Sequence, residues 1–431
     1  MGLGLRALNR MAASSAIDKL GLRKPAEKMV YGASRAGFAT AGAANRVFKS
    51  TQQFLQPVRL QARANDGLFD LTPSAEQDML RDTCRQFAAE QLRPAALSAD
   101  TRGRASPELL DAANDLGLHL LGVPESLGGA GQERSVVTGV IVAEALAHGD
   151  LGLALACLAP SAVSTALVLW GRSEQQARYL PAFASDKAPA ATLVIQEPAA
   201  LFDPFRLSTQ ARRTPDGYVL EGVKSLVPRA ADAELFLIAA HLEGRGPTLF
   251  TLESSNPGLS LHAEPAMGLR AAATGRLVLD RVALPHEALL GQGEAQVYAD
   301  CVNLARLAWC ALAVGTAQAA LDYLVPYVNE RIAFGEPVSH RQSVAFALAN
   351  MAIDIESMRL LTWRAASRAE QGHEFAEQTA LARQLCAQQA ARIGSDAVQL
   401  LGGHGFVKEH PAERWYRDLR AVGLMEGAVL V

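Results

Sequence analysis

The spacing of apolar residues divides the chain into parts with different periodicity. From Leu71 to about residue 190, apolar residues recur at helical spacing, which predicts helices. Between about residues 191 and 291 the period changes to two, which predicts strands. After Gly291 the helical spacing returns and continues to the C-terminus. We therefore expect an α+β protein with an N-terminal extension and three further domains. Their predicted ranges are 1–70, 71–190, 191–292 and 293–431.

Helix signals are clear on both sides of the β-rich part. Thr72-Pro73 resembles a cap and first-turn pair, and Pro107 opens a second helix that ends near Gly117. Another helix is predicted at 136–147. After the β domain we expect long helices at 297–328, 343–371 and 375–401, followed by a terminal helical run. Alanine-rich faces such as ALAVGTAQAALDYL permit close packing, which favours a four-helix bundle.

The middle of the chain contains short β-rich runs separated by turn residues. These runs are TLVI, GYVLEGVKS, ELFLIAAHL, PTLFTLE, LSLHA and GRLVLDRVAL. Asp216-Gly217 is a hairpin signal. The pattern predicts an antiparallel sheet or small barrel.

Composition fits a globular protein of several domains. Of 431 residues, 49% are hydrophobic and 20% charged, and no run of 18 apolar residues suggests a membrane span. The five cysteines show no CxxC, so we expect reduced core residues in a reducing compartment. The nine histidines include no HExxH motif, and we expect no structural metal and no nucleic-acid partner.

Charge is distributed unevenly along the chain. Residues 1–50 carry nine Lys/Arg against two acids, a balance of +7, so the remainder carries −10 of the total −3. This basic, Ala/Gly/Ser-rich extension has three interpretations: a transit peptide, an amphipathic arm on a membrane or partner, or a solvated helical extension. Its helix-like apolar spacing around 29–48 favours an arm or plain extension.

The last 33 residues hold the strongest candidate for chemistry. Gly402, Gly403 and Gly405 allow close approach of a ligand or partner backbone. Further on, Glu426 stands between Met425 and Gly427. A carboxyl group among apolar neighbours has its pKa raised toward the range useful for proton transfer. The alternative is an ordinary surface glutamate near the C-terminus.

Several motifs in this chain resemble the acyl-CoA dehydrogenase family. They are Q-x-x-GG-x-G-F from Gln399, P-x-E-R-x-Y-R-D from Pro411, and Glu426-Gly427. Further matches are LGLHLLGVPESLGGAG, Met267-Gly268-Leu269-Arg270, and Arg331-x-x-Phe334-Gly335 followed by Gln342. The resemblance spans about residues 70–431. It implies the family's helix–sheet–helix fold, FAD, an acyl-CoA substrate and an electron-transfer flavoprotein as acceptor.

The resemblance also implies roles for particular residues. Glu426 falls on the base that removes the α-proton of the thioester, and its backbone N–H would polarise the thioester carbonyl. The position of the rival base used by some family members is Ala305. Two groups of residues would reach the FAD of a neighbouring subunit: Arg331, Phe334, Gln342, Gln399, Gly402 and Gly403. Asn303, Arg306 and Gly427 correspond to substrate-side positions. These roles imply a homodimer or homotetramer, in the cytoplasm or the mitochondrial matrix.

The flavin-ring side departs from the family pattern. The motif T-E-P-x-x-G-S-D reads Gln196-Glu197-Pro198-Ala-Ala-Leu201-Phe202-Asp203, and W-I-T-N-G reads Leu-Val-Pro228-Arg-Ala. Pro228 offers neither a hydroxyl nor an N–H. Gln196 and Pro228 would therefore face the ring in place of the family's hydroxyls. These losses leave two alternatives to an acyl-CoA dehydrogenase: a degenerate subunit that completes a partner's FAD site, or a different thioester-linked reaction.

Overall fold

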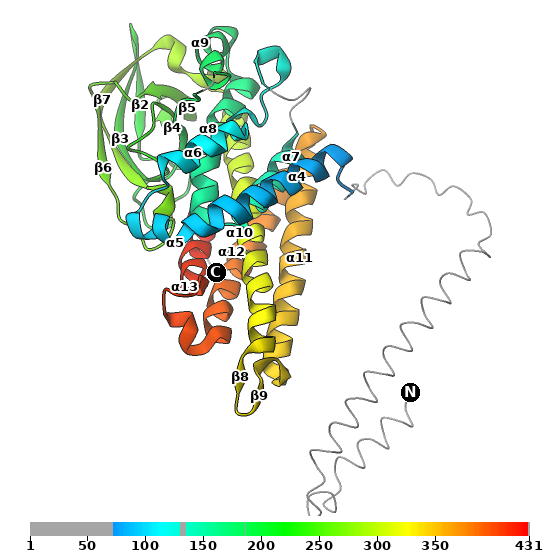
Figure 1. Ribbon diagram of the computed structural model, residues 1–431. Helices are drawn as coiled ribbons and strands as arrows, with labels where there is room; N and C mark the ends of the chain where they lie inside the picture. Colours follow the sequence, from blue (N-terminus) through cyan, green and yellow to red (C-terminus); the bar gives the residue numbers. More distant parts are fainter. Residues whose placement is uncertain (1–71, 130–134, 186, 430–431) are drawn as a thin grey trace, which may run out of the picture. The chain divides into compact units, whose positions relative to one another are not determined.

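The computed structural model describes residues 72–129, 135–185 and 187–429 (Figure 1). All of them belong to one compact unit, Phe69–Val431. The predicted basic extension at 1–70 lies outside the described residues, so its three interpretations stay predictions.

The N-terminal helical part begins at α4, Ala75–Phe87. Its cap is Ser74, not Thr72: the Ser74 hydroxyl accepts from the Gln77 N–H at 3.1 Å, and the Gln77 side chain accepts from the Ser74 N–H at 2.9 Å. A π-helical turn, Ala88–Leu92, links α4 to α5. The remaining helices are α5 Arg93–Arg102, α6 Pro107–Asp115, α7 Val136–Ala147, α8 Leu151–Trp170 and α9 Ser173–Phe183. The predicted helices from Pro107 and at 136–147 are confirmed.

The β domain is a seven-stranded sheet of order β1-β4-β2-β3-β7-β6, with β5 on the other edge of β4. The strands are β1 Ala191–Val194, β2 Gln210–Thr214, β3 Gly217–Val227, β4 Leu235–Leu242, β5 Gly246–Glu253, β6 Leu259–Ala263 and β7 Gly275–Pro285. The β2–β3 hairpin turns at the predicted Asp216-Gly217. Most pairings are antiparallel as predicted, but β4 pairs with both β1 and β2 in parallel. The sheet is therefore mixed, because β1 and β2 enter it after connections through other segments and not through hairpins with β4.

The C-terminal part consists of long helices that run side by side (Figure 1). They are α10 Ala295–Glu330, α11 Gln342–Glu370 and α12 Ala376–Leu401, close to the predicted limits. A small hairpin, β8 Ile332–Ala333 and β9 Glu336–Pro337, joins α10 to α11 at the end of the bundle farthest from the sheet (Figure 1). The terminal run forms only the short helix α13, Ala412–Asp418, and a 3₁₀ turn, Leu419–Gly423.

Helix α10 lies at the centre of the helical core and contacts both helical parts. At Gly315 a Cβ would lie 2.0 Å from the Glu144 carbonyl oxygen of α7, so only glycine permits this approach. Helices α8 and α10 are long and apolar enough to pass a membrane-span test, but 67% of each tested window is buried within the protein, as in core helices. All five cysteines are buried and free, which confirms that they are core residues.

Candidate active site

Glu426 lies in the wall of a cavity of about 990 Å³ between the two helical parts. Its side chain is buried, and Oε2 has no hydrogen-bond partner within the described residues. Cys301, Ala305 and Trp309 of α10 line the same cavity. A buried carboxylate oxygen without a protein partner, in a residue of the cavity wall, is available to a ligand.

The protonation of Glu426 is balanced near neutrality. Burial raises its pKa from 4.5 to about 7. The guanidinium groups of Arg383 and Arg306 oppose this rise by favouring the carboxylate, and a hydrogen bond from the Trp309 side chain acts in the same direction. A carboxyl group with such a pKa can accept a proton and release it again at physiological pH.

Two arginines, the buried Arg383 and the partly buried Arg306, hold the backbone on either side of this carboxylate. Arg306 Nε of α10 donates to the Glu426 carbonyl oxygen at 3.0 Å. Arg383 Nη2 of α12 donates to the carbonyl oxygens of Met425 and Gly427. Glu426 itself has φ 54°, a conformation rarely adopted by residues other than glycine. These three charge-assisted contacts would be costly to break, so they fix a strained backbone in one arrangement.

Close packing completes the hold on this segment. Gly427 has φ +110°, and a Cβ there would lie 2.7 Å from Pro204 Cδ and 2.9 Å from Arg306 Nη2. The next residue, Ala428, donates its N–H to the Phe202 carbonyl oxygen at 2.9 Å. The Glu426 N–H has no acceptor within the described residues, so it remains available to polarise a bound carbonyl group.

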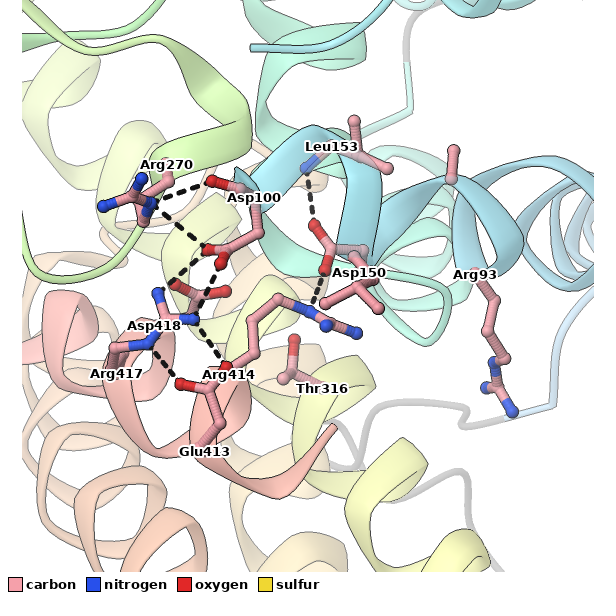
Figure 2. A network of polar contacts seen from close by, with 12 residues as sticks. Arg93, Asp100, Asp150, Leu153, Arg270, Thr316, Glu413, Arg414, Arg417 and Asp418 are labelled. Atoms are coloured by element: carbon pink, nitrogen blue, oxygen red, sulfur yellow. Dashed lines mark hydrogen bonds and ion pairs between the residues drawn. The ribbon is translucent and has the colours of Figure 1, made fainter. Parts of the chain in front are cut away.

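A buried ionic network anchors the helix that precedes Glu426 (Figure 2). Arg417 of α13 donates two hydrogen bonds to the Asp100 carboxylate, at 2.9 and 3.0 Å, and two to Glu413, at 2.7 and 3.0 Å. Arg414 donates to Asp150 at 2.8 Å. The motif P-x-E-R-x-Y-R-D therefore connects the C-terminal segment to α5 and α8.

Asp418 ends this motif and connects it to the β domain. Its carboxylate accepts from the Leu269 N–H at 2.7 Å. Burial raises the Asp418 pKa to about 7, and the nearby Asp150 adds to this effect. The active-site segment is thus positioned by contacts to all three domains.

The predicted substrate-side residues have varied surroundings. Arg306 is held by the Glu426 carbonyl group and lies over the Phe205 ring, with the guanidinium carbon 5.7 Å from the ring centre. Asn303 is buried in α10 and is not part of the cavity wall. Ala305 is in the wall, so no second carboxylate of α10 competes with Glu426 there.

The residues expected to reach a neighbouring FAD lie apart from the Glu426 cavity in this chain. None of them lines it. All are exposed: Arg331, Phe334, Gln342, Gln399, Gly402 and Gly403. Phe334 is 97% exposed, and the Arg331 side chain makes no hydrogen bond or ion pair to any described residue. An exposed aromatic ring beside an unpaired guanidinium is available for a partner molecule.

The flavin-ring side retains only part of the family motif. Glu197 accepts from Lys224 at 2.9 Å and from the N–H groups of Ser208 and Thr209, at 2.7 and 3.0 Å. Asp203 accepts from the Phe205 N–H at 3.0 Å. Glu197 and Asp203, which match the motif, therefore stabilise their own loop. This structural role does not require a bound flavin.

The positions that differ from the motif have varied surroundings. Gln196 is buried, and its Oε1 has no partner among the described residues. Pro228 lines the cavity, together with Thr192 and Leu193 of β1. Leu201 is 66% exposed with φ 53°. The cavity has room for a flat ring beside Pro228, with fewer hydroxyl contacts than the family motif would supply, and Gln196 is not among the residues that line it.

Sequence reasoning missed Arg383. The signal was present: Thr379, Cys386 and Ala390 of α12 are buried at helical spacing, and Arg383 occupies a core position of that stripe. A buried arginine requires acceptors, and here they are the carbonyl groups that flank Glu426.

This fold, with a helical part, a β domain and a second helical part, is that of the acyl-CoA dehydrogenase family. The N-terminal, middle and C-terminal domain models of that family match residues 74–187, 192–282 and 291–429. The chain belongs to the acyl-CoA dehydrogenase family.

Individual relatives agree with this assignment. The mitochondrial short-chain specific acyl-CoA dehydrogenase of Bos taurus is 34% identical over 358 residues, which cover 81% of this chain and 86% of that protein. The structure of butyryl-CoA dehydrogenase from Megasphaera elsdenii aligns with a TM-score of 0.77 and 28% identity, over 84% of this chain and 96% of that one. A structure of PigA with FAD and proline aligns with the same TM-score at 25% identity, over 84% of this chain and 96% of that one.

Proposed function

We propose that this protein is an FAD-dependent acyl-CoA dehydrogenase that converts an acyl-CoA thioester to the trans-2-enoyl-CoA. The observation that carries the proposal is Glu426: it lies buried in the cavity wall, its pKa is about 7, and its Oε2 has no partner within the described residues. A strained backbone and an unpaired buried carboxylate both lower the stability of the fold, so their presence together favours a functional role over an inactive site.

The residues of this chain supply the proton chemistry and the orientation. Glu426 Oε2 accepts the α-proton of the substrate, and the Glu426 N–H donates to the thioester oxygen, which acidifies the α-carbon. Arg306 and Arg383 keep both groups in place. Gly427 lets Pro204 and Arg306 pack closely against the segment, where a Cβ would not fit, and Asn303 is buried within α10. FAD, when bound, accepts the β-hydride.

The cofactor would be held by residues from two subunits. Gln196 and Pro228 would face the flavin ring beside Glu426, while the exposed Arg331, Phe334, Gln342, Gln399, Gly402 and Gly403 would serve the FAD of a neighbouring copy. This division supports a homodimer or a larger homo-oligomer. An electron-transfer flavoprotein is the proposed acceptor.

The first test is the visible spectrum of the purified protein before and after FAD is added. Flavin bands that bleach anaerobically with acyl-CoA are expected. Glu426→Gln should keep the colour and lower the bleaching rate by at least about 100-fold, because the base is lost. Glu377→Gln, an exposed position of α12, is the matched control and should bleach normally. Equal bleaching by the Glu426 variant would refute the proposal.

A second candidate is a subunit that completes a partner's FAD site without its own chemistry. Two features favour this second candidate. Pro228 offers no hydrogen-bond donor to a flavin, and Glu197 and Asp203 bond to residues of this chain. A colourless protein that takes up no FAD alone, but restores flavin binding to a related chain, would support this candidate over the first. A coloured protein that no acyl-CoA bleaches would instead indicate another thioester-linked reaction.

A further inference from the structure

The loop between β1 and β2 has bulky residues where the family motif has small ones. Leu201 and Phe202 occupy the glycine and serine positions of T-E-P-x-x-G-S-D, and Pro204 and Phe205 come shortly after. Phe202 and Pro204 are buried, and Phe202 belongs to the same hydrophobic cluster as Tyr298 of α10. The loop is therefore anchored in a core that the β domain shares with α10.

Hydrogen bonds within the loop restrict its turn. The Asp203 carboxylate accepts from the Phe205 N–H at 3.0 Å, and the Arg206 N–H donates to the Asp203 carbonyl oxygen at 3.0 Å. Pro204 lies between these residues, and its ring fixes its own φ. An aspartate that bonds to the backbone beside a proline leaves the turn few alternative conformations, so the loop presents its groups in one arrangement.

The loop contacts the two residues that follow the proposed base. The Phe202 carbonyl oxygen accepts from the Ala428 N–H at 2.9 Å. Pro204 packs against Gly427 so closely that a Cβ there would lie 2.7 Å from Pro204 Cδ. The backbone that follows Glu426 is therefore supported by the loop.

Phe205 reaches the same segment through Arg306. The Phe205 side chain is 42% exposed, and the Arg306 guanidinium carbon lies 5.7 Å from the centre of its ring. Arg306 Nε in turn donates to the Glu426 carbonyl oxygen at 3.0 Å. A guanidinium group over an aromatic face is attracted by the ring quadrupole, so Phe205 helps to keep Arg306 on its acceptor.

Tyr298 supports both Pro204 and Phe205 from α10. Its side chain is 2% exposed, and its hydroxyl donates to the Pro204 carbonyl oxygen at 2.6 Å. Its ring meets the Phe205 ring edge to face, with centroids 6.0 Å apart and planes at 90°. Burial raises the pKa of Tyr298 well above its ordinary value, so the hydroxyl remains a donor at physiological pH. Arg306 lies on the same helix, so α10 contacts the loop at two points.

Pro204, Phe205 and Tyr298 are not in the wall of the Glu426 cavity, so they do not contact a group that reacts there. We propose that Phe205 and Tyr298 are positioning residues for the reaction: Phe205 acts through Arg306 and Tyr298 through Pro204, and both hold the segment that carries Glu426. The effect on the reaction rate rests on the proposed dehydrogenase function. The effect on the backbone applies whatever reaction the chain catalyses.

Hydrogen–deuterium exchange tests the backbone directly on the intact protein. The reporter is the Ala428 N–H, in a peptide of residues 424–429, because this group donates to the Phe202 carbonyl oxygen. Phe205→Leu keeps an apolar side chain but removes the aromatic face, so exchange at this amide should become about twofold to thirtyfold faster. Tyr298→Phe removes only the hydroxyl and should give an increase of about twofold to tenfold.

Tyr218→Phe is the matched control. Tyr218 is buried in the β domain, forms an edge-to-face pair with Phe250 at 5.2 Å between centroids, and is not in the cavity wall. Its loss of a hydroxyl should leave exchange of residues 424–429 unchanged. Phe205→Tyr keeps the ring and should recover most of the protection lost in Phe205→Leu. Unchanged exchange in both Phe205→Leu and Tyr298→Phe would overturn the inference; if the buried variant does not fold, the partly exposed Phe205 decides alone.

Anaerobic flavin bleaching gives the second readout. Phe205→Leu should lower the bleaching rate at saturating acyl-CoA by about twofold to thirtyfold and leave the half-saturating concentration nearly unchanged. In an Arg306→Met background the same change should lower the rate by less than about twofold, because the route through Arg306 is already lost. The full decrease in that background, or a change in half-saturation alone, would overturn the inference.

The proposed function and this inference fail in different ways. If no acyl-CoA bleaches the flavin of the unsubstituted protein, the dehydrogenase function is wrong, and the exchange measurement still decides the inference. If the unsubstituted protein and both variants bleach alike and exchange alike, the function stands and the inference is wrong.

Discussion

Replacing Arg383 by glutamine should shift the pH dependence of the reaction toward alkaline pH. Its guanidinium group favours the ionised form of Glu426, whose pKa is about 7. Glu426 must be deprotonated to act as a base, so kcat/KM should rise with pH through that value. Without Arg383 the carboxylate loses part of its stabilisation, and its pKa rises further.

The size of the effect follows from the electrostatic contribution. A loss of about 1.4 kcal/mol of attraction corresponds to a tenfold change in proton affinity. At pH 7 the ionised fraction of Glu426 would then fall from about one half to about one tenth, so the rate falls roughly fivefold. Above pH 9 this part of the loss should disappear.

A second loss, independent of pH, comes from the backbone. The carbonyl groups of Met425 and Gly427 lose their shared donor, and each buried acceptor left unpaired costs about 1–3 kcal/mol. Arg383→Lys retains the charge with poorer geometry, so it should keep the acid limb near its original pH while kcat decreases. Calorimetric unfolding reports the stability change separately.

The assay is anaerobic flavin reduction measured from pH 6 to pH 9.5. Arg392→Gln is the matched control, because Arg392 lies on the same helix and pairs with the partly exposed Asp354 away from the cavity. An acid limb at the same pH in Arg383→Gln and in the unsubstituted protein would refute the proposed electrostatic role of Arg383.

Two further variants test the segment that carries Glu426. Gly427→Ala should destabilise the fold by about 1–3 kcal/mol and reduce activity, because φ +110° and the close Pro204 leave no room for a Cβ; equal melting temperatures would contradict this. Asp418 has a folded-state pKa raised from 3.8 to about 7, so its contribution to folding stability is fully present below about pH 4 and is lost as the pH rises toward 7. Asp418→Asn keeps an acceptor for the Leu269 N–H and should raise the melting temperature at pH 8 more than at pH 5. An equal change at both pH values would show that Asp418 does not titrate in this range.

The sequence predicts the main elements because their residues repeat with the period of the structure they form. The helix at Val136–Ala147 and the strands β3–β7 are apolar at the expected spacing. Strand β2 was missed because its sequence, QARRT, is polar, and only one of its five residues is buried. Its position is fixed by pairing with β3 and β4, which its own composition does not encode.

The candidate site is predictable only in part. Glu426 could be identified from its apolar neighbours and the family motif, and its burial confirms the expected rise in pKa. The contacts that hold it could not be predicted, since Arg383, Arg306 and Phe202 are distant in sequence from residue 426. Such contacts depend on how α10, α12 and the β domain pack together.

The strained backbone at Glu426 explains why residues from several distant elements contact this segment. A residue at φ 54° followed by a glycine at φ 110° has little intrinsic preference for one conformation, so this segment needs external support. That support comes from arginines on α10 and α12, the Phe202 carbonyl group and the network around Arg417. Because each support belongs to a different element, the base reaches its position only when the three domains are packed together. The same packing of α10 against the N-terminal helices and the β domain forms the cavity wall beside Glu426.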